Sequence, residues 1–297
     1  MQLTIITINL NNYEGLKKTI DSIRCQTWRN FEWIVIDGGS TDGSTALIES
    51  EKNNLAYWCS EPDKGVYNAM NKGVEKASGQ YVLFMNSGDC LHDKKVLEDI
   101  FQDKQYSADI LIGKVLHVGS NVIVNKYGID SGLLDHWDII RGINHQGAFT
   151  KLKVLKKYPF DENFVIISDR KFWLQTLVQN NCTVYVLDRL VADYDLTGIS
   201  STNKELYAKE EREIMKQLFS PALAYALQDY KSIRESVIYV RLTYMKHHYP
   251  LLYKLSQKML AVILLFVLAT NKKIYDKESL YYYKAANTRK FSFLCFV

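Results

Sequence analysis

The sequence predicts an α/β protein with a mixed, mostly parallel sheet flanked by helices, followed by a C-terminal helical extension. Three observations lead to this prediction. β-Branched runs alternate with amphipathic segments over the first 85 residues, only 4 prolines occur among 297 residues, and residues 231–297 differ from the rest in charge. Alternating strands and helices are typical of parallel sheets with right-handed crossovers. We expect one domain over residues 1–217 and an extension over residues 218–297.

The first half of the chain is a regular alternation of strands and helices. The run LTIITI at residues 3–8 is typical of a strand that is buried on both faces. Apolar residues at i, i+4 and i+7 from Leu16 predict the helix that follows. Thr41 or Asp42 is the expected cap of the second helix. The remaining predicted strands cover residues 31–37, 55–59 and 81–85, and the remaining helices cover residues 42–48 and 66–77.

The second half is less regular. Residues 108–118 and 121–125 predict two strands, which Gly119 and Ser120 could join as a hairpin. A helix is expected from Asp169 to about residue 179, and a charged helix over residues 203–217. Short strands are expected at residues 145–149, 183–187 and 190–194.

Small polar and acidic residues follow the predicted parallel strands. They are Asn9 and Asn11, Asp37, Asp63, and Asn86 with Asp89. Ligands of open α/β sheets bind beyond the carboxyl ends of the strands, so these residues predict a site on one rim. The sequence lacks both G-x-G-x-x-G and a P-loop. A divalent metal held by carboxylates is therefore the simplest way to bind phosphates.

Cysteines and the N-terminus indicate the compartment. Five cysteines at scattered positions match neither a zinc site nor a disulfide framework, so we expect free thiols in a reducing compartment. The N-terminal MQLTIITINL lacks a basic region and a cleavage site and reads as a strand rather than a signal peptide. The expected location is the cytoplasm.

The block SEPDKGVYNAMNKGVEKASGQYVLFMNSGD at residues 60–89 resembles family 2 glycosyltransferases with the GT-A fold, of the bacterial surface-polysaccharide type. TIITINLNN (4–12), IDGGSTDGS (36–44), FDENF (160–164) and ISDRKFWLQ (167–175) occur in the family's order and spacing. The resemblance covers roughly residues 1–200. Five motifs in sequence make it far more specific than any one motif alone.

The resemblance implies a role for each residue that matches a motif. Asp169 aligns with the general base, Asp89 with the ligand of a Mg²⁺ or Mn²⁺ ion, and His145 and Gln146 with acceptor or diphosphate contacts. There are departures: Asn86 and Gly88 interrupt the D-x-D motif, Gly38 replaces the commoner second acid after strand two, and Ser168 replaces the Glu of the Glu-Asp pair. The residues implied in binding the donor nucleotide are Thr7, Asn9, Asp37, Asp63 and Asn86.

The implied activity is inverting, metal-dependent transfer of a hexosyl or N-acetylhexosaminyl group. The donor is a nucleotide-sugar, first of all a UDP-sugar, and the acceptor is a hydroxyl of a glycan or a polyprenyl-linked lipid in polysaccharide biosynthesis. For two residues a purely structural role is the alternative to the functional one: Asp89 could be a turn acid and Asp169 a helix cap. A non-catalytic nucleotide-sugar-binding scaffold is the alternative function. A nucleotidyltransferase ranks last, because NLNNYEGLKK contains a single glycine.

The C-terminal extension is basic, aromatic and apolar. Residues 231–297 contain 12 Lys and Arg against 3 Asp and Glu, a net +9, which leaves −5 on residues 1–230. The uninterrupted apolar run over residues 259–269 is shorter than the roughly 20 residues of a membrane span. Together with the aromatic clusters at 281–283 and 291–297, it predicts a peripheral helix on the inner face of the membrane. Packing on the body or in an oligomer is the alternative, and no nucleic-acid partner is expected.

Overall fold

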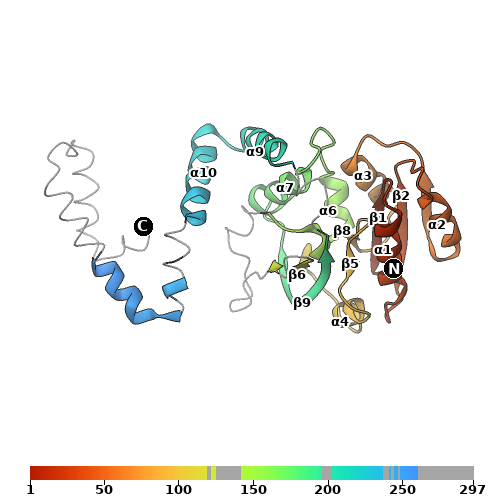
Figure 1. The fold of residues 1–297 in the computed structure, drawn as a ribbon, viewed down its shortest axis with the longest axis horizontal. Coiled ribbons are helices and arrows are strands. Elements are labelled where there is room, and N and C mark those ends of the chain that lie inside the picture. Colours follow the sequence, from red (N-terminus) through yellow and green to blue (C-terminus); the bar gives the residue numbers. More distant parts are fainter. Residues whose placement is uncertain are drawn as a thin grey trace. The chain divides into compact units, whose positions relative to one another are not determined.

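The computed structural model describes residues 1–118, 122–124, 142–195, 203–236, 241, 244–246 and 248–259. The chain divides into two compact units, Met1–Leu227 and Gln228–Val297. The sheet and the helices up to α9 belong to the first unit (Figure 1). The predicted boundary between residues 217 and 218 lies at the end of α9 (Lys204–Leu218) and stays a prediction.

The N-terminal half forms the predicted parallel sheet. Strand β1 (Leu3–Asn9) pairs in parallel with β2 (Phe31–Asp37) and with β4 (Tyr81–Phe84), and β2 pairs in parallel with β3 (Tyr57–Ser60). The crossovers contain α1 (Tyr13–Arg24), α2 (Ser44–Ser50), the 3₁₀ turn η1 (Lys52–Asn54) and α3 (Val66–Lys76) (Figure 1). The cap position of α2 is Gly43, which has a φ of 96°, rather than Thr41 or Asp42.

The C-terminal half extends the same sheet with mixed strand directions. The order is β3-β2-β1-β4-β8-β6-β9-β5, with β7 paired to β6. Strand β8 (Ala148–Lys151) lies antiparallel between β4 and β6 (Ile110–His117), and β9 (Val184–Tyr194) runs parallel to β6. The predicted hairpin of β6 with β7 (Val122–Val124) is confirmed as an antiparallel pair. Further elements are β5 (Cys90–Leu91), α4 (Val96–Phe101), the 3₁₀ turn η2 (His145–Gly147), α6 (Leu152–Lys157), α7 (Ser168–Trp173), its π-helical continuation η3 (Leu174–Gln179) and α10 (Pro221–Glu235).

Two sequence predictions are wrong in this half. Residues 183–187 and 190–194 form the single strand β9, because Asp188 and Arg189 lie at an irregularity of the β6–β9 ladder instead of in a turn. This irregularity faces Gly113, where a methyl group would lie 2.4 Å from Val191 Cγ2 and 2.9 Å from the Arg189 carbonyl oxygen. The predicted strand 145–149 is the turn η2 for its first three residues, and only Ala148 begins a strand.

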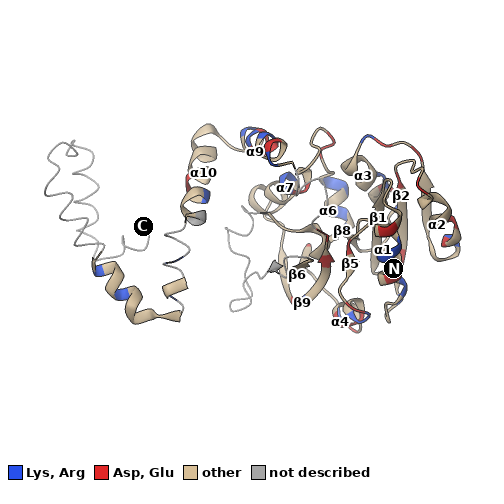
Figure 2. Ribbon diagram, viewed as in Figure 1, with Lys and Arg blue, Asp and Glu red and all other residues tan. Residues whose placement is uncertain are grey.

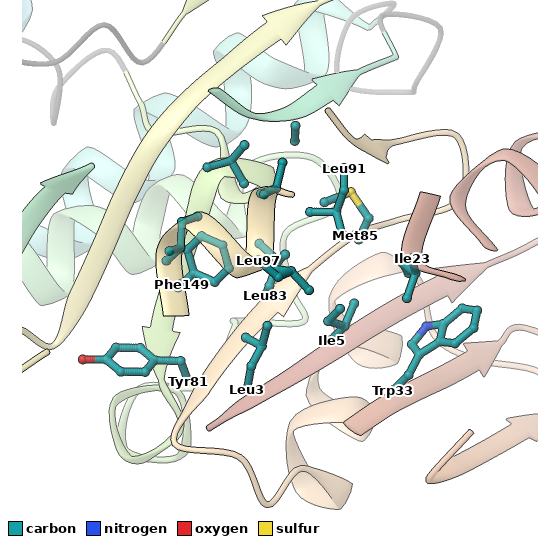
Figure 3. Packing of buried hydrophobic residues seen from close by; sticks show 14 of the residues in the cluster. Leu3, Ile5, Ile23, Trp33, Tyr81, Leu83, Met85, Leu91, Leu97 and Phe149 are labelled. Atoms are coloured by element: carbon teal, nitrogen blue, oxygen red, sulfur yellow. The ribbon is translucent and has the colours of Figure 1, made fainter. Parts of the chain in front are cut away.

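Apolar side chains cover both faces of the sheet. On one face, α1 and α4 pack through Ile23 and Leu97 on side chains of β1, β2 and β4 (Figure 3). On the other face, α3, α6 and α7 pack on the alternate side chains of the same strands. A third, smaller cluster joins α9 to η3 and to the segment before α7, and it consists of Phe164, Ile166, Ile167, Leu174 and Ile214. The strands are therefore fixed from both sides, and their carboxyl ends open at one edge.

The described part of the extension is helical. Besides α10, residues 250–259 form a helix. Among the residues that the structure describes, none of the helices has the length and apolar character needed to cross a bilayer. The described residues end at Met259. Most of the apolar run at 259–269 therefore lies outside them, as do the aromatic clusters at 281–283 and 291–297.

Candidate functional site

A cavity of about 830 Å³ lies where β1 and β4 end. The sheet order reverses direction at these two strands, which is where open α/β sheets bind ligands. The turn η2, the start of α7 and the end of β9 complete its walls. Seven of the nine predicted site residues line it, namely Asn9, Asp63, Asn86, Asp89, His145, Gln146 and Asp169. Most of the predicted site residues therefore line one cavity, whereas Asn11, Thr7 and Asp37 are not among its lining residues.

Thr7 and Asp37 lie behind the cavity wall. Both side chains are fully buried, and the Thr7 hydroxyl accepts a hydrogen bond from the Trp33 indole at 3.0 Å. Asp37 accepts bonds from Asn9 Nδ2 at 2.8 Å and from the Ser40 and Ser60 hydroxyls at 2.6 Å each. Burial raises the pKa of Asp37, but these hydrogen bonds outweigh it and hold the pKa below its ordinary value. Asp37 therefore reaches the cavity only through Asn9.

Two asparagine side chains line the cavity, and each has an amide oxygen that accepts no hydrogen bond from the described residues. The Asn9 amide nitrogen donates to Asp37, and the Asn86 amide nitrogen donates to His145 Nε2 at 3.2 Å. Among the described residues, Asn9 Oδ1 and Asn86 Oδ1 are buried without a hydrogen-bond partner. A buried polar atom without a partner calls for an explanation, and a ligand that donates N–H or O–H groups supplies one.

Asp63 explains one departure from the family motif. Its carboxylate accepts a bond from the Gly65 amide at 2.8 Å and lies against the end of β2. A methyl group at Gly38 would lie 2.7 Å from Asp63 Oδ2 and 3.3 Å from Leu10 Cδ1. Glycine at position 38 therefore makes room for Asp63 at the site where the family more often has a second acid.

Asp89 is a buried acid on the cavity wall. Its side chain accepts bonds from Gln146 Nε2 at 2.9 Å and from the Asp195 backbone amide at 3.1 Å. The turn before it closes by a bond from the Asp89 amide to the Asn86 carbonyl, and Gly88 takes a φ of 105°. Burial is the largest influence on Asp89 and raises its pKa to about 6, although both hydrogen bonds act the other way. The acid is thus both part of a turn and part of the cavity.

A chain of hydrogen bonds holds Asp169. His145 Nδ1 lies 3.1 Å from Asp169 Oδ2, and the Tyr67 hydroxyl donates to Asp169 Oδ1 at 3.1 Å. An imidazole that carries its proton on Nδ1 would accept from Asn86 Nδ2 and donate to the Asp169 carboxylate. The side chains of His145 and Asp169 keep 15% and 19% of their surface exposed. They are held in place, yet a ligand can reach them.

The helix-cap alternative for Asp169 is wrong. The cap position of α7 is Ile167, which makes no side-chain cap bond, and Asp169 is the second residue of the helix. Its one bond to the helix backbone comes from the adjacent Arg170 amide at 2.8 Å. The carboxylate therefore satisfies one first-turn amide of α7 and at the same time contacts His145 and Tyr67.

Further polar residues that the sequence motifs did not single out also line the cavity, among them Tyr67, Arg170, Asp195 and Tyr207. Asp195 follows β9 directly, so the rule that selected Asp89 at the end of a strand would also have selected it. It contributes a second acid beside Asp89 and increases the pKa of Asp89 by repulsion. Tyr67 and Arg170 lie within the motif blocks that resemble the family, but their roles depend on contacts with residues about 40 to 100 positions away.

The donor set suits a weakly held hard cation. Within the described ranges, no group of three or more His, Cys, Asp or Glu side chains is arranged as a metal site. Asp89 and Asp195 nevertheless bring two carboxylates to one wall of the cavity. Mg²⁺ commonly takes only one or two carboxylates and completes its shell with substrate phosphates and water, so the two acids fit such an ion.

Residues 4–164 match the sequence profile of glycosyl transferase family 2. An uncharacterised glycosyltransferase of Mycobacterium tuberculosis is 30% identical over 216 residues, which cover 67% of this chain and 77% of the relative. The poly(ribitol-phosphate) beta-N-acetylglucosaminyltransferase TarP of Staphylococcus aureus is 28% identical over 238 residues, or 73% of this chain and 72% of TarP.

Solved structures agree on the architecture. Residues 1–349 of S. aureus TarS in complex with UDP-GlcNAc superpose with a TM-score of 0.60 at 20% identity, over 79% of this chain and 72% of that one. At this identity the likeness concerns the fold. Because the family profile spans more than half of the sequence and the cavity lies where that fold binds its ligands, the chain belongs to glycosyl transferase family 2 and is a glycosyltransferase with the GT-A fold.

Proposed function

We propose that this glycosyltransferase transfers a hexosyl or N-acetylhexosaminyl group from a UDP-sugar to a hydroxyl of a glycan or lipid-linked acceptor, with inversion, in polysaccharide biosynthesis. The observation that carries the proposal is that Asp63, Asp89 and Asp169, from separate parts of the sequence, line one cavity. TarP, named as an N-acetylglucosaminyltransferase, and TarS, solved with UDP-GlcNAc, support a UDP-sugar as the donor.

The nucleoside end of the donor is assigned to the edge formed by β1 and β2. Asn9, Asp63 and Asn86 are the proposed contacts, and the partnerless amide oxygens of Asn9 and Asn86 suit N–H or O–H donors of a nucleoside. Asp37 supports Asn9 from behind. Thr7 was expected at the base pocket, and with its buried hydroxyl bonded to Trp33 we propose a supporting role for it.

Asp169 is the proposed general base. The acceptor hydroxyl must lose its proton as its oxygen attacks the anomeric carbon, while the bond from that carbon to the diphosphate breaks. A carboxylate within hydrogen-bond reach takes the proton and typically contributes about 10² to 10⁴-fold to the rate. His145 and Tyr67 hold the Asp169 oxygens in the cavity, at 3.1 Å each. Attack from the side opposite the leaving diphosphate inverts the anomeric centre.

Asp89 and Asp195 are the proposed ligands of Mg²⁺ or Mn²⁺. When bound, such an ion would neutralise the charge that grows on the leaving diphosphate. Gln146 is hydrogen-bonded to Asp89 at 2.9 Å and orients this acid from the side of η2. His145 and Gln146, both expected at the acceptor or the diphosphate, are thus proposed to act beside Asp169 and Asp89 respectively.

A donor screen tests the proposal. Purified protein is incubated with UDP-, GDP- and dTDP-sugars, with and without Mn²⁺, and nucleotide release is measured with and without acceptor glycans. We expect release from a UDP-sugar that depends on Mn²⁺ and is lost in Asp169→Asn and in Asp89→Asn. Nucleotide binding without turnover for any donor would instead identify the scaffold alternative. Full turnover in both folded variants would overturn the assigned roles.

The extension is the proposed membrane-binding element. In the helix 250–259, Leu251, Leu252, Leu255 and Met259 expose 76%, 53%, 56% and 65% of their surface. The charged residues of this helix are the lysines Lys254 and Lys258, whereas α9 carries both signs (Figure 2). Apolar side chains beside lysines suit a helix that lies in the head-group region of an anionic membrane, and the inner face of the cytoplasmic membrane is the proposed location.

Vesicle sedimentation tests the membrane assignment. The protein is mixed with vesicles of phosphatidylcholine that contain 30% or no phosphatidylglycerol, and the pelleted fraction is measured. We expect binding to the anionic vesicles, a loss of binding in Lys254→Glu/Lys258→Glu, and no loss in the control Lys209→Glu on the exposed side of α9. Oligomers in solution together with absent vesicle binding would support the packing alternative.

A further inference from the structure

Helix α9 contributes a buried acid that does not line the cavity. Glu210 keeps only 6% of its surface exposed, on a helix whose other acidic residues are half-buried or exposed. A buried carboxylate is costly unless hydrogen bonds compensate for the lost water. Its partners therefore show why the chain keeps an acid here.

Three consecutive backbone N–H groups converge on Glu210. The Val165 amide donates to Oε1 at 2.7 Å, and the Ile166 and Ile167 amides donate to Oε2 at 3.0 and 3.1 Å. Hydrogen bonds from backbone N–H groups to a carboxylate are charge-assisted and stronger than neutral ones. One side chain thus fixes the backbone of the segment that leads into α7.

The same segment is also held from the opposite side. The buried Tyr67 hydroxyl shares its single proton between the Ile166 carbonyl, at 2.6 Å, and Asp169 Oδ1, at 3.1 Å. Burial raises the pKa of Tyr67 well above its ordinary value, so this hydroxyl remains a donor at any working pH. Residue 166 is therefore held by its N–H from α9 and by its C=O from α3, three positions before Asp169.

Helix α9 also holds the residue that follows Asp169. Arg170 is 4% exposed, and its guanidinium donates to the Tyr207 hydroxyl at 2.7 Å and forms an ion pair with Glu211 at 2.7 Å. Ile214, one turn further on, packs on Phe164, Ile166 and Ile167. Asp169 lies between two segments that α9 holds in place.

We propose that Glu210 is a positioning residue for sugar transfer. Its carboxylate fixes residues 165–167 and thereby holds Asp169 at the distance from His145 that the cavity requires. The inference rests on the proposed role of Asp169 as general base. A displacement of about 1 Å at a reacting group can cost about 10²-fold in rate, so a residue that touches no substrate can still control turnover.

The test compares Glu210→Ala and Glu210→Gln with the control Glu213→Ala. Glu213 lies on the same helix, is exposed, and bonds only to Gln217 within the described contacts. Transfer kinetics are measured at saturating donor, UDP binding by calorimetry, and exchange of the amide protons of residues 165–170 by mass spectrometry. Melting temperature confirms that each variant is folded.

We expect Glu210→Ala to lower kcat about 10- to 100-fold while the donor KM and the UDP Kd change less than twofold. Glu210→Gln keeps one carbonyl oxygen, which can accept two N–H bonds, so its loss should be smaller. Amide exchange at residues 165–167 should accelerate in Glu210→Ala and stay unchanged in Glu213→Ala. A role in stability alone would lower the melting temperature without this separation of kcat from KM.

The proposal is overturned if folded Glu210→Ala retains the wild-type kcat, or if its amide exchange over residues 165–167 matches that of the wild type. The exchange measurement needs no turnover. If the wild-type protein transfers no sugar, the proposed function fails on that result, and unchanged exchange would separately refute the contact between Glu210 and the segment before Asp169.

Discussion

Replacement of Asp89 by asparagine tests the electrostatics of the cavity directly. Asp89 is 4% exposed, and its burial raises the pKa of the carboxyl from 3.8 to about 6. The unfolded chain returns the carboxyl to water, where its pKa is ordinary. Asparagine has nearly the same shape and keeps an acceptor oxygen for Gln146 or for the Asp195 amide, but it cannot titrate.

The size of the effect follows from proton linkage. A folded-state pKa of about 6 against 3.8 unfolded is a difference of about 2 units, and each unit corresponds to 1.36 kcal/mol. Because the folded state binds the proton more tightly, the contribution of Asp89 to stability is greatest below pH 4 and falls as the pH rises through 6. The free energy of unfolding of Asp89→Asn relative to wild type should therefore rise by about 2 kcal/mol between pH 4 and pH 7.

Urea unfolding followed by tryptophan fluorescence at intervals between pH 4 and pH 7 measures this difference. EDTA is included so that no divalent ion binds the ionised acid. Groups that titrate in both proteins cancel in the comparison, and Asp103→Asn, at an exposed position, controls for the loss of one negative charge. A difference that stays constant over this range would show that Asp89 has the same proton affinity in the folded and unfolded chains, which would refute the burial argument.

Three further predictions concern the base, its support and the sheet. Asp169→Asn should lower kcat by about 10² to 10⁴-fold with UDP binding retained, and a folded variant with wild-type kcat would contradict the base assignment. Tyr67→Phe leaves the Ile166 carbonyl without its donor and should destabilise the protein by about 1–3 kcal/mol in urea unfolding, whereas an unchanged midpoint would count against that bond. Gly79→Ala places a methyl group 2.6 Å from the backbone of Leu3 and Thr4, and the overlap should cost about 1–3 kcal/mol of stability. The melting temperature should therefore fall by several degrees. An unchanged melting temperature would show that the backbone of β1 moves aside without cost.

Local patterns predicted the N-terminal sheet because its signals are local. The run at residues 3–8 and the apolar spacing after Leu16 each specify one element without reference to the rest of the chain. The single strand β9 was missed for the opposite reason. Asp188 and Arg189 resemble a turn, and the partner that accommodates them in the ladder, Gly113, lies more than 70 residues away.

Sequence alone also determined that acids would meet at one edge, because parallel strands place all their carboxyl ends on the same side of a sheet. Only the tertiary structure decided which of them reach the cavity: Asp89 and Asp169 line it, and Asp37 is sealed behind Asn9. The tertiary structure also decided the surroundings of these acids. Gln146 donates a hydrogen bond to Asp89, and Glu210 accepts hydrogen bonds from the segment before Asp169, in each case between residues more than 40 positions apart. The ionisation and orientation of a carboxylate depend on burial and on partners brought by folding, and neither is present in the local sequence.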